Sequence, residues 1–323
     1  MIFQGFNPPP VHLTVISDHG GLGDSIARLP AFRYCLETYP HVSLTVHVID
    51  AFKGLCEYLL PGNDRLTWKL RSEVPFRPRR PYVEFNPDRV SSLALGLTDQ
   101  AFLMLMDHLP PDDGGEAANY PVAPLTENQA WLNQLCGEGR GAIVFTTDYT
   151  APTRQWPVFQ VNALAYKLND LGFTCVLLGR AKPVATGVED DPIKPNALDG
   201  LKGELFVDLR DKTTLIEALG VMQRSKAVLG VDNGLIHLAH CTSVPVVVGY
   251  TSLLAMHRLP TRPHGRTEYI QAGEGYCTGC QSKGFAVNHD WRVCINVEHP
   301  YCCQLDLLPD RFLNKLRLLG VIS

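Results

Sequence analysis

The segment 228–240 constrains the fold of this chain more strongly than any other part of its sequence. It begins with a short apolar run that is typical of a buried strand, and it breaks at Asp232-Asn233-Gly234, residue types that favour turns and helix starts. Apolar residues at helical spacing follow, and a second apolar run occupies 244–248. This order predicts a βαβ unit of a parallel sheet, in which ligands bind at the carboxyl ends of the strands.

The turn at the centre of this segment has two interpretations. Asp232 can cap the helix, and the backbone amides around Asn233 and Gly234 suit a phosphate group. His237 lies one turn into the helix, and its side chain is expected to lean back toward the same end. A capped helix with a polar histidine on its rim explains the pattern equally well, so both interpretations stay open on these residues alone.

A related pattern stands near the N-terminus, where an apolar run at 11–16 leads into a glycine-rich loop. Gly21 and Gly23 resemble the start of a dinucleotide-binding fingerprint, but Ile26 stands where the third glycine belongs. Asp24 follows at the start of the next helix. It is either a helix cap or a carboxylate that takes a proton from a ligand, and the cap is the simpler explanation of this residue alone.

The second half of the chain repeats the alternation of strands and helices. We expect strands at 142–145, 173–178, 205–209 and 228–231, with helices at 158–171 and 213–223. Thr146, Thr147, Arg154 and Asp232 then fall at strand ends or before helices, on one edge of a parallel sheet. A guanidinium with hydroxyl groups and helix amides is suited to hold a diphosphate.

Composition limits the kind of protein. The 323 residues suffice for two domains, and we place the boundary in the glycine-containing segment 136–141, which divides the chain into domains 1–136 and 137–305. The chain has a formal net charge of −4 and therefore lacks the excess of basic residues typical of nucleic-acid-binding proteins. We expect no nucleic acid partner. There is no apolar run long enough to span a bilayer and no signal-peptide pattern, which predicts a cytoplasmic protein that can also work at a membrane surface.

Five of the ten cysteines lie in the Cys-rich segment 277–303, and they are Cys277, Cys280, Cys294, Cys302 and Cys303. The C-x-x-C at its start and the downstream cysteines have a spacing compatible with a structural zinc site of four cysteines. His289 and His299 are further candidate ligands. Reduced thiols and disulfides are the alternatives, and a cytoplasmic location disfavours disulfides.

Three segments resemble the heptosyltransferase-like glycosyltransferases of glycosyltransferase family 9. They are the Gly-Asp turn with its Leu-Pro-Ala helix at 23–32, the run at 208–215, and the Asp-Asn-Gly-x-x-His block at 231–246. The resemblance implies an α/β protein of the GT-B architecture, with two Rossmann-like parallel-sheet domains facing a central cleft. It also implies that the helix within 306–323 packs back on the N-terminal domain.

The resemblance implies roles for individual residues. Asp24 matches the proposed catalytic base, which deprotonates an acceptor hydroxyl as that group attacks and inverts the anomeric carbon. Gly21, Gly23 and Ser25 lie on the loop near the acceptor. The positions that match contacts to the donor are Thr146, Thr147, Arg154, Asp232, Asn233, Gly234 and His237.

The implied substrates are a nucleoside-diphosphate sugar, heptose-like or other, and a glycan or other hydroxyl acceptor. No cofactor is required for the chemistry, because protein cations stabilise the leaving diphosphate, and the chain contains no Asp-x-Asp motif. The segment after Thr251 departs from the family pattern and 51–136 shows no match, so neither the sugar nor the acceptor is implied.

A nucleotide-binding oxidoreductase or a catalytically silent sugar-nucleotide-binding protein is the alternative on the same paired sheets. The missing third glycine weakens the oxidoreductase, although Asp50 ends the second strand as a ribose-binding carboxylate would.

Overall fold

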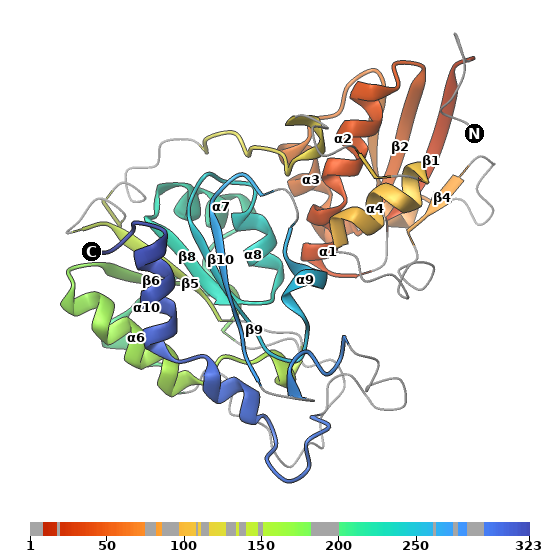
Figure 1. Cartoon of the computed structure of the whole chain (residues 1–323). Helices are drawn as coiled ribbons and strands as arrows, with labels where there is room; N and C mark the ends of the chain where they lie inside the picture. The colour runs from red at the N-terminus through yellow and green to blue at the C-terminus, as the bar shows by residue number, and fades with distance from the viewer. Residues whose placement is uncertain are drawn as a thin grey trace. The chain divides into compact units, whose positions relative to one another are not determined.

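Two parallel sheets organise the chain, one in each of two structural units, as the computed structural model in Figure 1 shows. The structure describes residues 9–17, 20–74, 82–85, 97–107, 109–110, 116–126, 134–135, 140–147, 151–181, 200–260, 263–273, 277–282 and 294–323. His289, a candidate zinc ligand, and most of the segment 127–139 lie outside these residues.

The first unit consists of Met1–Pro124 and Leu259–His264. Its four strands are all parallel and lie in the order β3-β2-β1-β4. Its main elements are β1 (Val11–Ser17), α1 (Leu22–Ala27), α2 (Leu29–Thr38), β2 (Val42–Val48), α3 (Lys53–Leu59), β3 (Leu66–Leu70), β4 (Tyr82–Glu84) and α4 (Leu97–Met106). The helix that follows the glycine-rich loop is interrupted at Arg28, because Pro30 has no N–H to continue the hydrogen bonding of α1.

The second unit consists of Leu125–Arg258 and Gly265–Ser323. Its six strands are parallel and lie in the order β10-β9-β8-β5-β6-β7. The elements are β5 (Ala142–Thr146), α6 (Val158–Asp170), β6 (Thr174–Leu178), β7 (Val207–Asp208), α7 (Leu215–Arg224), β8 (Ala227–Val231), α8 (Gly234–Ala239), β9 (Val246–Tyr250), α9 (Ala255–Arg258), β10 (Thr267–Gln271) and α10 (Pro309–Leu318).

The strand order of this sheet reverses between β5 and β8. From β5 the chain proceeds to β6 and β7 on one side, and from β8 it proceeds to β9 and β10 on the other. Such a reversal is the place where open α/β sheets bind ligands, because the connections diverge there and leave the strand ends accessible. β5, β8 and β9 are buried along their whole length, as expected of central strands covered on both faces.

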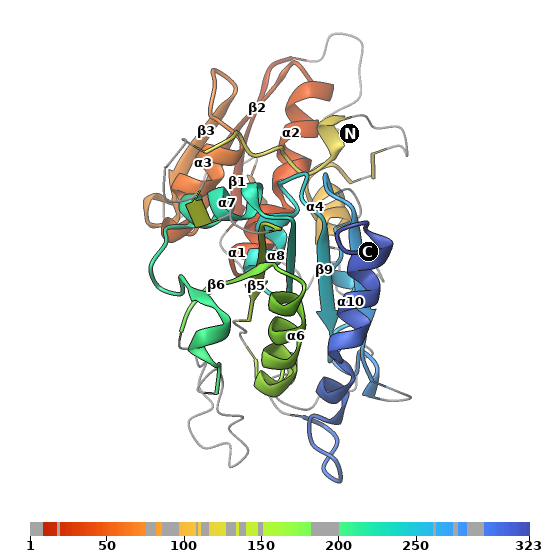
Figure 2. The same ribbon diagram turned by 90° about the vertical axis from the view of Figure 1, so that its left-hand side faces the viewer.

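Helices α6 and α10 lie side by side on the second sheet, as Figures 1 and 2 both show. Phe312 of α10 stacks on Trp156, with ring centroids 4.2 Å apart, and both side chains are fully buried. This packing corrects the expectation that the helix within 306–323 packs on the N-terminal domain. The apolar face of α10 covers the same core as α6, and its C-terminal neighbour Leu319 also belongs to that core.

The units divide at Pro124, before the expected boundary in the segment 136–141. The side chains of two residues at the end of α7 explain the difference. Arg224 donates hydrogen bonds to the hydroxyl and carbonyl oxygens of Thr126, and Gln223 accepts one from its amide. The chain is therefore attached to the second unit before the glycine-containing segment. Within the described residues, no helix is long and apolar enough to cross a membrane.

Candidate functional site

The ends of β5 and β8 bring together the predicted donor residues at the point where the strand order reverses. Thr146 ends β5 opposite Gly230 of β8, and Thr147 follows it. Asp232 and Asn233 follow β8 directly. Neighbouring parallel strands end on the same edge, so these four polar residues lie together, as the sequence predicted.

Asn233, rather than Asp232, caps helix α8. Its Oδ1 accepts a hydrogen bond from the amide of Ile236 at 3.0 Å, and its Nδ2 donates to both the carbonyl and the hydroxyl oxygen of Thr146 at 3.2 Å. The interpretation of Asp232 as the cap was therefore wrong. Gly230 makes room for this arrangement, because a Cβ on it would lie 2.0 Å from Thr146 Oγ1.

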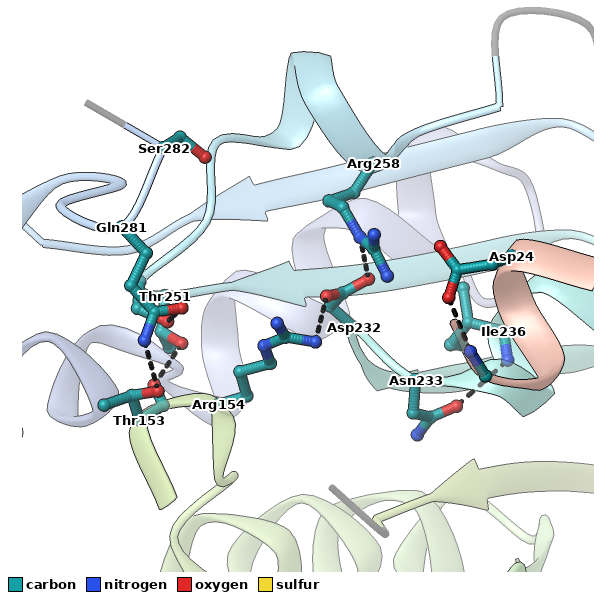
Figure 3. Close-up of polar contacts among 12 residues, drawn as sticks. Asp24, Thr153, Arg154, Asp232, Asn233, Ile236, Thr251, Arg258, Gln281 and Ser282 are labelled. Carbon is teal, nitrogen blue, oxygen red and sulfur yellow. Dashed lines mark hydrogen bonds and ion pairs between the residues drawn. The ribbon is translucent and has the colours of Figure 1, made fainter. Parts of the chain in front are cut away.

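Asp232 does not cap the helix and instead forms ion pairs with two arginines (Figure 3). Its Oδ2 lies 3.2 Å from Arg154 Nη1, and its Oδ1 lies 3.2 Å from Arg258 Nε. Burial works to raise the pKa of Asp232, but the charges of Arg258 and Arg154, with a smaller contribution from His237, outweigh it and hold that pKa below its usual value. Asp232 is therefore a carboxylate at neutral pH.

Arg258 was missed by the sequence analysis. It ends α9, a four-residue helix in the connection between β9 and β10. No spacing rule relates Arg258 to Asp232, because 26 residues of chain separate them and only the fold brings them together. The signal that could have prompted the search was a buried acid at a strand end, since such a group requires a cation.

Of the remaining predicted donor residues, Thr147 and His237 are buried, whereas Gly234 is partly exposed. Thr147 is fully buried, and its hydroxyl oxygen has no hydrogen-bond partner among the described residues. Gly234 is the first residue of α8, and His237 is buried further along that helix. A buried hydroxyl without a partner is costly, so the Thr147 side chain is suited to a polar ligand.

Asp24 is the third residue of α1, and Gly21 is the N-cap. The carboxylate reaches back so that its Oδ2 accepts a hydrogen bond from the Gly21 amide at 2.8 Å, and Ser25 donates one to the Gly21 carbonyl at 3.2 Å. The predicted N-cap position is thus corrected, while a contact that stabilises the helix start is present. Gly20 has a φ of +93°, and a Cβ there would overlap the Asp24 side chain. Gly23 is buried in α1.

Comparisons with known proteins identify the family. The sequence model of glycosyltransferase family 9 (heptosyltransferase) matches residues 116–284. The chain belongs to glycosyltransferase family 9. This confirms the resemblance seen in the sequence. Lipooligosaccharide heptosyltransferase 2 of Haemophilus influenzae is 32% identical over 99 residues, a match that covers 31% of this chain and only 28% of that relative.

Solved structures confirm the expected GT-B fold for this family 9 protein. TibC of enterotoxigenic E. coli, described as an iron-containing dodecameric glycosyltransferase, superposes with a TM-score of 0.72 at 15% identity, covering 97% of this chain and 76% of TibC. A second TibC structure holds ADP-D-beta-D-heptose; it has a TM-score of 0.69 at 15% identity and covers 95% and 76% of the two chains. ADP-heptose heptosyltransferase II of E. coli has a TM-score of 0.61 at 16% identity, covering 96% and 98%.

The turn that carries Arg154 in this family 9 member is held by hydrogen bonds from three other side chains. Thr251, just after β9, donates its hydroxyl to the Thr153 carbonyl at 2.6 Å. Gln281 donates to the Thr153 hydroxyl at 3.0 Å, and Gln304 donates to the Pro152 carbonyl. Figure 3 shows the first two of these contacts beside Arg154. The position of the guanidinium therefore depends on residues within and next to the Cys-rich segment.

All five cysteines of the Cys-rich segment line one cavity, together with Thr153 and Ser252 of the second unit. The Sγ atoms of Cys277 and Cys302 are 3.9 Å apart, and Asn296 donates to both. Burial raises the pKa of Cys303 to about 12. Among the described residues, no three or more His, Cys, Asp or Glu side chains are placed to hold a metal ion. The fold gathers the thiols, but zinc ligation stays a prediction.

Proposed function

We propose that this family 9 protein transfers a sugar from a nucleoside-diphosphate sugar to an acceptor hydroxyl. The single observation that carries the proposal is the set of polar groups where the strand order of the second sheet reverses. Thr146 and Thr147 lie at the end of β5, and the guanidiniums of Arg154 and Arg258 pair with Asp232 at the end of the neighbouring strand β8. This combination suits a diphosphate that gains negative charge as the bond to the sugar breaks.

The proposed donor is an ADP-heptose. The family description names heptosyltransferases, and one structural neighbour was solved with ADP-D-beta-D-heptose. The neighbour is only 15% identical to this chain, so the sugar and the base are part of the proposal. Other nucleoside-diphosphate sugars are therefore compared with ADP-heptose as donors in the assay described below.

The proposed reaction is a single displacement with inversion. An acceptor oxygen attacks the anomeric carbon, the bond between that carbon and the diphosphate breaks, and the diphosphate leaves with the electron pair. The proton of the acceptor hydroxyl passes to the carboxylate of Asp24. Arg154 and Arg258 stabilise the departing diphosphate, so the proposed chemistry does not require a metal ion.

The function is tested by measuring the release of nucleoside diphosphate from the sugar donor, with the protein alone and with a panel of hydroxyl acceptors. Transfer to an acceptor, with the anomeric configuration inverted in the product, is the expected result. Tight donor binding without release would favour a catalytically silent binding protein. Stabilisation against heat by NAD(H) but not by nucleoside diphosphates would favour the oxidoreductase.

We also propose that the Cys-rich segment binds one metal ion. Four thiolates form the ligand set that zinc and iron share, and five thiols line one cavity here. TibC is described as iron-containing, so iron joins zinc as a candidate. Elemental analysis of protein purified without chelator should give about one equivalent, and chelation should lower its melting temperature. Absence of both metals would leave the five cysteines as plain thiols.

A further inference from the structure

The ion pairs around Asp232 indicate a substrate-binding role for Arg258 that the family resemblance did not imply. Asp232 is 4% exposed, and the side chains of Arg154 and Arg258 are 16% and 17% exposed. Each carboxylate oxygen contacts a different guanidinium, at 3.2 Å in both cases. One carboxylate thus holds two cations, which approach it from separate directions (Figure 3).

The charge of this trio is complementary to an anion. Two guanidiniums and one carboxylate carry a formal charge of +1, and water reaches little of any of the three side chains. Burying charge without a counter-charge is costly. Asp232 stands at the carboxyl end of β8, and Arg154 and Arg258 follow β5 and β9, the two strands that flank β8. Strand ends of this kind are where a parallel sheet binds its ligand.

We propose that Arg258 is the second phosphate-binding guanidinium of the donor site. Asp232 is the positioning residue, which orients Arg154 and Arg258 toward the two phosphates of a nucleoside diphosphate. The inference rests on the proposed function, since it takes a diphosphate as the ligand of this edge. Guanidinium groups bind phosphate oxygens in pairs of hydrogen bonds, and holding two of them in place beforehand lowers the cost of ordering them on binding.

The short helix α8 does not explain the same binding. It has six residues, fewer than two turns. Asn233 also uses its side chain to satisfy the Ile236 amide, one of the donors at the start of that helix. In the proposed site the two guanidiniums therefore supply the positive charge that recognises the phosphates, beside the hydroxyl groups of β5, and Asp232 fixes the orientation of both guanidiniums.

The experiment is calorimetry on the full chain with ADP and UDP, and with AMP and UMP as the matching monophosphates. Arg258→Gln should weaken diphosphate binding by about 10- to 100-fold and abolish the preference for diphosphate over monophosphate. Arg258→Lys keeps the charge and should show a smaller but equally selective loss, which preserves the test if the Gln variant does not fold. Arg224→Gln is the matched control, because it removes a partly buried guanidinium bound to Thr126.

Asp232→Asn tests the positioning role separately. It removes a negative charge near the phosphates, so simple electrostatics predicts tighter ADP binding. If the carboxylate orients the two arginines, ADP binding should weaken instead, despite the more favourable charge. Tighter binding by a folded Asp232→Asn protein would overturn the positioning role.

Other outcomes would overturn the assignment of Arg258. If a folded Arg258→Gln protein retains the wild-type preference for ADP over AMP, Arg258 does not contact a phosphate. An equal loss for both nucleotides would show an arginine that only supports the local structure. If Arg154→Gln weakens binding and Arg258→Gln does not, only this inference fails. If the unaltered protein binds neither ADP nor UDP, the proposed donor site fails with it.

Discussion

Replacing Asp232 by Asn should destabilise the folded protein far more than a carboxylate-to-amide change elsewhere on the same sheet. The substitution keeps the shape of the side chain but leaves Arg154 and Arg258 without their shared counter-charge in a mostly buried place. Breaking a buried ion pair by removing one partner costs about 3–5 kcal/mol. Because both arginines keep a little exposure, we expect the free energy of unfolding to fall by about 3 kcal/mol.

The matched control is Asp208→Asn. Asp208 also ends a strand, β7, and pairs with Arg210, but its side chain is 37% exposed. Solvent screens such a pair, so its loss should cost at most about 1 kcal/mol. Urea unfolding of the two variants and the unaltered protein, followed by circular dichroism, measures the difference directly.

The pH dependence supplies an independent check of the Asp232 prediction. The pKa of Asp232 is held below its usual value in the folded protein, whereas the unfolded chain has an ordinary carboxyl pKa of about 3.9. The ionised group therefore stabilises the fold fully above the unfolded pKa, and this contribution is lost as the pH falls through the folded pKa. The stability gap between the unaltered protein and Asp232→Asn should be constant near neutral pH and shrink below about pH 4. A gap no larger than that of Asp208→Asn would refute the reasoning.

Three further predictions concern the proposed catalytic base, the core and the contact between β5 and β8. Asp24→Asn should keep the contact to the Gly21 amide through its amide oxygen, yet lower turnover by roughly 10²–10⁴-fold at unchanged nucleotide affinity; near-normal turnover would leave Asp24 as a helix-stabilising residue only. Trp156→Ala should lower the free energy of unfolding by about 3–5 kcal/mol, because Trp156 is fully buried between Phe145 and Phe312, whereas the exposed Phe159 of the same region should cost less than about 0.5 kcal/mol when changed to Ala. Gly230→Ala should destabilise by about 1–3 kcal/mol and weaken nucleotide binding, since the added methyl displaces Thr146 Oγ1; unchanged melting and binding would contradict the close packing of β5 and β8.

The family assignment and the gathering of the proposed donor residues at one sheet edge rested on local patterns that the sequence displays directly. Short apolar runs alternate with helical spacing, and this alternation predicted the parallel sheets that the structure contains. Polar residues that directly follow such runs are carried to one edge by the geometry of parallel strands. Thr146, Thr147 and Asp232 therefore lie together, as predicted. Strand β10 (Thr267–Gln271) was not predicted, because it is an edge strand in which Ile270 is the one buried residue, so its sequence contains no continuous apolar run.

Contacts between distant segments were decided only by the tertiary structure. The pairing of Asp232 with Arg258 depends on where the connection after β9 returns to the sheet, and no local propensity encodes that path. The capping of α8 by Asn233, where the sequence suggested Asp232, also depends on contacts between distant segments. Two side chains of similar capping ability compete for one helix start, and the carboxylate pairs instead with Arg154 and Arg258, which lie in the segments that follow β5 and β9.

The last helix and the cysteines also combine a feature that the sequence displays with a contact that only the tertiary structure decides. The amphipathic pattern of α10 was visible in the sequence, but an apolar face does not specify its partner. The buried ring of Trp156, in the core of the second unit, provided the complementary surface. The spacing of Cys277 and Cys280 marked a cluster, and the loop path brought Cys302 within 3.9 Å of Cys277. Local sequence determined which elements form and what chemistry their ends carry. Which distant side chains meet was decided by packing, because burial energy depends on the whole set of surfaces that fold together.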